Sequence, residues 1–201
     1  GSEMCIRDRY KSDMLPKEQI EKILDAARVA PSGKNRQPWK FLVYGGEEKK
    51  KILSEMRKGI KRELKEPLFK ESKRLLPDAD NTLHIMMNAP VVVFVINTNG
   101  KSPVENIDMD DRFSEICDTL SIGAAIENML LAAQELGVGS LWIGNTCFAY
   151  RELAEYIGEE GQLIGAVAFG IADEEPEARP RKKLEDIVCL LYTSDAADEA
   201  R

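Results

Sequence analysis

The feature that most restricts the fold of this sequence is an apolar run at positions 90–97, PVVVFVIN. Valine, phenylalanine and isoleucine follow one another here without the polar and apolar alternation of a half-exposed strand. β-branched and aromatic residues favour strands, and an unbroken apolar run is typical of a strand covered on both faces. The sequence therefore predicts a central strand at 90–97, with other elements packed on both sides of it.

Further strands and helices surround that strand in an irregular order. From their β-branched and aromatic residues, we expect strands at 39–44, 140–143 and 162–172. From apolar residues at helical spacing, we expect helices at 16–30, 47–76, 113–136 and 151–157. Because strands and helices do not alternate regularly, this order predicts an α+β domain rather than a doubly wound sheet. The 201 residues suit one domain, which we take as 10–188.

Two of the expected helices leave alternatives open. The segment 47–76 is rich in Lys and Arg and has an apolar stripe, which fits either a solvated helix pair packed on the core or a mobile lid over a site. The segment 113–136 is apolar over a wide surface, which indicates deep burial or burial at a subunit interface.

Composition argues against several classes of function. A net charge of −7 disfavours a general nucleic-acid binder, which needs a cationic face. We find no apolar run as long as a membrane span and no apolar segment of a signal peptide, so we expect a cytoplasmic protein without membrane contact. The four cysteines lack a Cys-x-x-Cys spacing and His84 is the only histidine, which makes a metal site or a Ser-His-Asp site improbable. We therefore predict no metal and no catalytic side chain, and chemistry that depends on a bound cofactor.

The two ends of the chain do not continue the patterns beside them. Residues 1–9 (GSEMCIRDR) and 189–201 (CLLYTSDAADEAR) resemble translated sequencing-adaptor read-through. A natural, poorly ordered terminus is the alternative. We interpret both segments as non-native and exclude them from the fold prediction.

The segment 31–39, PSGKNRQPW, concentrates polar groups between an expected helix and an expected strand. Its hydroxyl, backbone amides and carboxamides can bind a polar heterocycle. An ordinary helix-to-strand connection favours the same residue types. The glycines of Gly137-Val-Gly139 follow a helix and precede a strand, which is the reverse of a dinucleotide-binding turn, so we interpret them as a helix end.

Three ordered blocks resemble the FMN-dependent nitroreductase family. They are ARVAPSGKNRQPWKF at 27–41, GAAIENMLLAA with LGVGSLWIG at 123–144, and IGAVAFG with RPRKKLEDI at 164–187. The resemblance implies a nitroreductase-like α+β fold, in which helices flank a central mixed or antiparallel sheet. It also implies an intimate homodimer with one FMN in each of two clefts at the interface.

The same resemblance assigns cofactor-binding residues. Those expected to approach or line the flavin are Pro31, Ser32, Gly33, Asn35, Gln37, Trp142, Ile143 and Gly144. Arg179 and Arg181 match the basic pair that meets the FMN phosphate and the flavin edge, for which a guanidinium is suited. The family's phosphate-binding Arg-Arg-Ser element aligns with Met4, Cys5 and Ile6, so we expect weaker FMN binding than in a chain with that element restored.

The activity implied by the resemblance is electron transfer from NADH or NADPH, through FMN, to a small-molecule acceptor such as a nitroaromatic or a quinone. Within the same superfamily, a dehalogenase-type or a flavin-destroying reaction is the alternative. Outside it, the alternatives are a flavin-binding carrier or sensor without turnover and a chain that folds but stays without flavin.

Overall fold

The computed structural model describes residues 10–11, 13–173 and 180–191, and its four strands form one sheet. The strand order is β1-β2-β4-β3, and every neighbouring pair is antiparallel. The strands are β1 (Trp39–Gly45), β2 (Val91–Asn97), β3 (Val138–Ile143) and β4 (Gln162–Ile171). The α+β class and the antiparallel form of the predicted sheet are confirmed.

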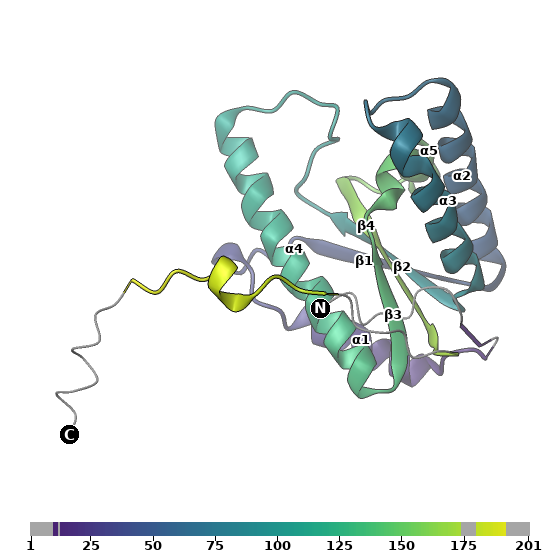
Figure 1. The fold of residues 1–201 in the computed structure, drawn as a ribbon, viewed down its shortest axis with the longest axis horizontal. Helices are drawn as coiled ribbons and strands as arrows, with labels where there is room; N and C mark the ends of the chain where they lie inside the picture. Colours follow the sequence, from purple (N-terminus) through teal and green to yellow (C-terminus); the bar gives the residue numbers. More distant parts are fainter. Residues whose placement is uncertain (1–9, 12, 174–179, 192–201) are drawn as a thin grey trace.

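Helices cover both faces of this sheet (Figure 1). The α-helices are α1 (Lys17–Arg28), α2 (Gly46–Lys65), α3 (Ser72–Asn88), α4 (Met109–Glu135) and α5 (Tyr150–Ile157). Short 3-10 helices are η2 (Gly33–Asn35), η3 (Asn145–Ala149) and η4 (Leu184–Asp186). Apolar residues of α1 and α4 pack on one face, and those of α2, α3, η3 and α5 pack on the other.

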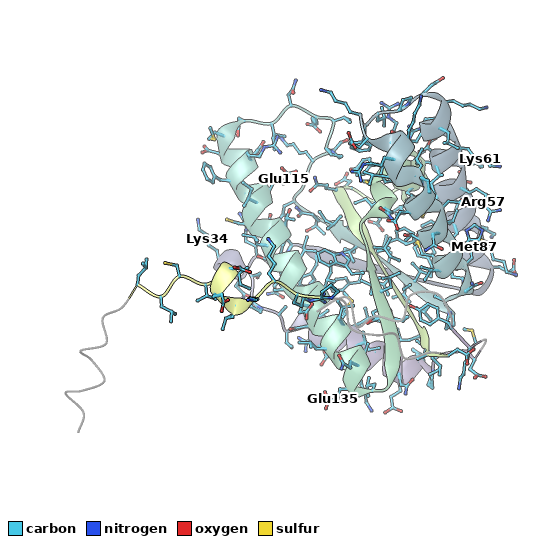
Figure 2. All side chains as sticks on the ribbon, in the orientation of Figure 1. Lys34, Arg57, Lys61, Met87, Glu115 and Glu135 are labelled. Carbon is cyan, nitrogen blue, oxygen red and sulfur yellow. The ribbon has the colours of Figure 1, made fainter. Side chains whose placement is uncertain are left out.

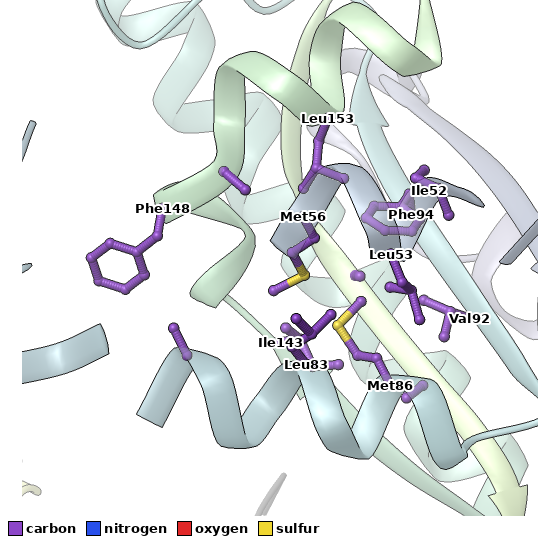
Figure 3. Close-up of a cluster of buried hydrophobic side chains, with 14 of the residues drawn as sticks. Ile52, Leu53, Met56, Leu83, Met86, Val92, Phe94, Ile143, Phe148 and Leu153 are labelled. Carbon is purple, nitrogen blue, oxygen red and sulfur yellow. The ribbon is translucent and has the colours of Figure 1, made fainter. Parts of the chain in front are cut away.

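Strand β2 is the centre of both cores, as its apolar run predicts. All of its residues are buried. Val93 and Val95 contact the α1 and α4 side, whereas Val92 and Phe94 contact the side of α2 and α3, where Figure 3 shows them among the helix side chains. Each such side chain stabilises the fold by about 1.5–3 kcal/mol through burial.

The segment 47–76 differs in detail from the prediction. It is two helices separated by a turn at 66–71, and the second helix continues through Pro77 to Asn88, beyond the predicted end. Because Leu83 and Met86 are fully buried, tertiary packing outweighs the hydrogen bond that a proline inside a helix forfeits. Both helices belong to the core, which favours the packed helix pair over the mobile lid.

Helix α4 begins where Asp108 Oδ1 accepts a hydrogen bond from the Asp111 amide at 2.8 Å. Within the described residues it is the one helix whose length and composition would allow it to cross a membrane, whereas the sequence analysis predicts no such segment. Its inner face is packed into the core, and 44% of its most apolar stretch is buried. The apolar residues of that face are those of a core helix.

Candidate functional site

The 31–38 loop, which joins α1 to β1, is braced by its own side chains. Ser32 Oγ accepts a hydrogen bond from the Gln37 amide at 3.0 Å, and Gln37 Nε2 donates to Asn35 Oδ1 at 3.1 Å. Lys34, Asn35 and Gln37 have φ angles of 54°, 54° and 48°. Residues other than glycine rarely adopt this left-handed backbone conformation, so contacts with the rest of the protein must stabilise it here.

Two residues attach the 31–38 loop to α4. The Gly33 amide donates to Ser121 Oγ at 3.1 Å, so this amide is already used within the chain. Arg36 Nη2 forms an ion pair with Asp118 Oδ1 at 2.7 Å and donates to the Ser114 carbonyl at 3.2 Å. In Figure 2, Lys34 of the same loop lies beside α4.

The ion pair of Arg36 and Asp118 was not predicted from the sequence. Asp118 is buried, and its second oxygen accepts a hydrogen bond from Asn99 Nδ2 at 3.2 Å. The available signal was a carboxylate on the inner face of a predicted apolar helix, because buried carboxylates in proteins are paired. This pair makes Arg36 a structural anchor of the loop.

A second group of predicted residues lies at the end of β3. Trp142 is 47% exposed and pairs with Val167 on the sheet face that α1 and α4 cover. Ile143 is buried on the opposite face, and Gly144 is exposed at the start of the turn into η3. A side chain at Gly165 would lie 2.7 Å from the Ile143 carbonyl oxygen, so glycine permits this close pairing of β3 and β4.

The two groups share one end of the sheet but lie at its opposite edges. The loop precedes β1 and the 144–149 turn follows β3, with β2 and β4 between them. Three strand spacings separate such positions by roughly 14 Å. Within one copy of the chain, the two groups of predicted residues therefore lie apart.

The basic residues expected at the phosphate lie in the C-terminal segment. Arg181 is exposed, and the segment that contains it runs past α4 and away from the body of the protein (Figure 1). Arg179 lies outside the described residues, as do Met4, Cys5 and Ile6. Within the described ranges, no group of three or more His, Cys, Asp and Glu side chains could hold a metal ion.

Comparison with known proteins identifies one family. The model of the Nitroreductase family matches residues 4–171. A relative from Archaeoglobus fulgidus, named as a NADH dehydrogenase/NAD(P)H nitroreductase, is 34% identical over 173 residues, which cover 84% of this chain and 80% of the relative.

Solved structures have the same fold. A BluB-like flavoprotein from Clostridium difficile has a TM-score of 0.78 and 27% identity, over 94% of both chains. A nitroreductase with bound FMN from Desulfitobacterium hafniense has a TM-score of 0.69 and 20% identity, over 95% of both chains.

Proposed function

This chain belongs to the nitroreductase family, and from that premise we propose that it is a cytoplasmic, FMN-dependent oxidoreductase that transfers electrons from NADH or NADPH to a small acceptor such as a nitroaromatic or a quinone. The observation that carries the proposal is the polar loop 31–38, which its own hydrogen bonds brace and which lies at the same end of the sheet as the exposed Trp142 and Gly144. The name of the Archaeoglobus relative and the FMN bound to the Desulfitobacterium nitroreductase support the electron donor and the cofactor.

The chemistry of the two groups of predicted residues fits a flavin nucleotide. Ser32, Asn35 and Gln37 offer hydroxyl and carboxamide groups to a polar ring, and their mutual hydrogen bonds keep them in place. Pro31 and Gly33 complete the surface of the loop. When bound, FMN supplies the redox chemistry.

The end of β3 has a different task in this proposal. Trp142 and the backbone of Ile143 and Gly144 would lie beside the ring, where an amide donor favours the electron-rich reduced form. Arg179 and Arg181 would bind the phosphate as fixed positive charges. We assign no side chain as acid or base, since the residues bind and orient the cofactor and shield it from water.

We further propose that two copies form an intimate homodimer through α4, and that each cleft is shared. The outer face of α4 carries a row of exposed apolar side chains at helical spacing, which are Met109, Phe113, Ile116 and Leu120. Exposed apolar residues continue in the C-terminal segment at Leu184, Ile187 and Val188. Surfaces of this kind mark an interface, and a two-fold axis would place the loop of one copy near the β3 end of the other.

The first experiment is an absorption spectrum of the purified chain, followed by NADPH without oxygen. Flavin bands that bleach are the expected result. Bound flavin that neither NADPH nor NADH bleaches would favour the carrier or sensor. A protein that stays colourless after incubation with FMN would contradict the proposal, and the same test on a variant with Arg-Arg-Ser at positions 4–6 would show whether that element is the cause.

A further inference from the structure

The 144–149 turn, which follows β3, packs closely against α2. At Gly59 of α2, no side chain separates the helix from the turn. A methyl group at Gly59 would overlap Ala149 Cβ and Cα and lie 2.7 Å from Glu152 Oε2. Phe148, Leu153 and Met56 of α2 belong to one cluster of buried side chains (Figure 3). The helix therefore lies directly against the backbone of η3.

Arg62 of α2 reaches across this contact with three donor groups. Its Nη2 donates to the Phe148 carbonyl at 3.1 Å, and its Nε donates to Glu152 Oε1 at 2.8 Å. Its Nη1 donates to Glu63 Oε2 at 2.6 Å. The side chain is only 19% exposed, so these bonds form largely out of water. A planar guanidinium can serve three directions at once, which a lysine ammonium cannot match in this geometry.

Glu63 extends the same network to the start of α3. Its buried carboxylate accepts hydrogen bonds from Ser72 Oγ at 2.6 Å and from the amides of Leu68 and Phe69 at 2.6 and 3.1 Å. The turn between α2 and α3 is thereby fixed relative to Arg62. Arg62, Glu63 and Glu152 thus form one hydrogen-bonded group, the arginine cluster.

Helix α3 holds the first residue of η3 from another direction. Asn145 Nδ2 donates to Asp78 Oδ2 at 2.8 Å and to Thr82 Oγ1 at 2.9 Å. The Cys147 amide donates to the Gly144 carbonyl at 3.1 Å, which closes the turn. Gly144 therefore stands between β3 and a segment that both α2 and α3 restrain.

We propose that Arg62 is a positioning residue, which sets the backbone of Gly144 through the arginine cluster and η3. The assignment rests on the proposed function, in which Gly144 lies beside the flavin. In this proposal the helix pair of residues 46–88 does not act as a lid. It restrains the position of the turn that faces the cofactor.

The test compares Arg62→Gln and Arg62→Lys with Arg57→Gln. Arg57 lies on the same helix, and its Nη2 donates a hydrogen bond to Met87 Sδ at 2.9 Å, on the outer flank of the molecule (Figure 2). The measurement is the ratio of the dissociation constants for oxidised and reduced FMN, at a temperature where every variant is folded. A displaced Gly144 amide should lower the preference for the reduced form on the order of tenfold in Arg62→Gln. Arg62→Lys should lower it as well, and Arg57→Gln should not change it.

Several outcomes would overturn the assignment. An Arg62→Gln protein with a lower melting temperature but an unchanged ratio shows that Arg62 only stabilises the fold. Should that variant not fold, Arg62→Lys takes its place with the same criterion, because a lysine ammonium cannot form the same set of bonds to Phe148, Glu152 and Glu63. If wild type binds FMN and the ratio does not move in either variant, the assignment fails while the proposed function stands. If wild type binds no FMN, both fail.

Discussion

Arg36 Nη2 lies 2.7 Å from Asp118 Oδ1, and this ion pair ties the loop before β1 to the middle of α4. The Asp118 side chain is 2% exposed, whereas that of Arg36 is 31% exposed. The carboxylate depends on its partner more than the guanidinium does, because Arg36 can turn toward water. An arginine is bonded close to each of the two groups of predicted residues, Arg36 in the 31–38 loop and Arg62 against η3, which follows β3.

This asymmetry predicts unequal effects of removing the two partners. Arg36→Gln leaves a buried carboxylate with one amide donor and should lower the free energy of unfolding by about 2–4 kcal/mol. Asp118→Asn should lower it by about 1–2 kcal/mol. Urea unfolding of both variants and of the double variant measures these values. The double variant should be more stable than the sum of the single effects predicts. A larger effect of Asp118→Asn than of Arg36→Gln would contradict this account.

The exposed face of α4 predicts an effect on assembly. Leu120 is 71% exposed in a single copy, so Leu120→Glu should leave the isolated chain folded. At an apolar interface the same change introduces a charge without a partner, and self-association should weaken by more than about tenfold. Sedimentation velocity over a concentration series measures it. Val104→Glu, at another exposed apolar residue in a loop, is the matched control. Equal association of wild type and Leu120→Glu would argue against this interface.

The sequence predicts the strands better than the site, for a physical reason. The apolar run of β2 requires cover on both faces wherever it lies, so a central strand between two layers could be predicted from it, and the irregular order of strands and helices predicted the α+β class. The predicted end of the helical segment, at residue 76, was wrong. Pro77 disfavours a helix locally, whereas the burial of Leu83 and Met86, which stabilises the helix beyond it, is a tertiary effect. The separation of the loop from Trp142 depends on strand order, and the ion pair of Arg36 and Asp118 joins segments distant in sequence. Neither the strand order nor this ion pair produces a local pattern in the sequence from which it could be predicted.

Acid should weaken the arginine cluster. Burial raises the pKa of Glu63, but hydrogen bonds from Ser72, the Phe69 amide, Arg62 and the Leu68 amide outweigh it and hold the pKa below its usual value. The pKa of Glu152 is also lowered, since its bond to Arg62 and smaller effects outweigh burial. A carboxyl with a lowered folded-state pKa stabilises the fold above its unfolded value of about 4.3, and this stabilisation is lost as pH falls through the folded value.

The measurement is the free energy of unfolding of wild type and Glu63→Gln between neutral pH and about pH 3, a window set by the unfolded pKa. Glu63→Gln should be less stable at neutral pH, and the difference should shrink as the pH falls below about 4.3. Glu71→Gln, which removes an exposed ion pair with Arg74, should change stability by less than about 1 kcal/mol at every pH. A difference between wild type and Glu63→Gln that is constant across this range would show that the carboxylate charge is not what stabilises the cluster.

Gly59→Ala should be more damaging than its helical position suggests. Alanine is the better helix former by up to about 1 kcal/mol, so the intrinsic effect is stabilising. The added methyl would overlap Ala149, and separating α2 from η3 should cost about 1–3 kcal/mol or more. Ser54→Ala, at an exposed position of α2, isolates the propensity effect and should be neutral or slightly stabilising. Urea unfolding of both variants decides between the two effects. If Gly59→Ala is as stable as wild type, η3 can move away from α2 freely, and the close packing does not restrain the turn at Gly144.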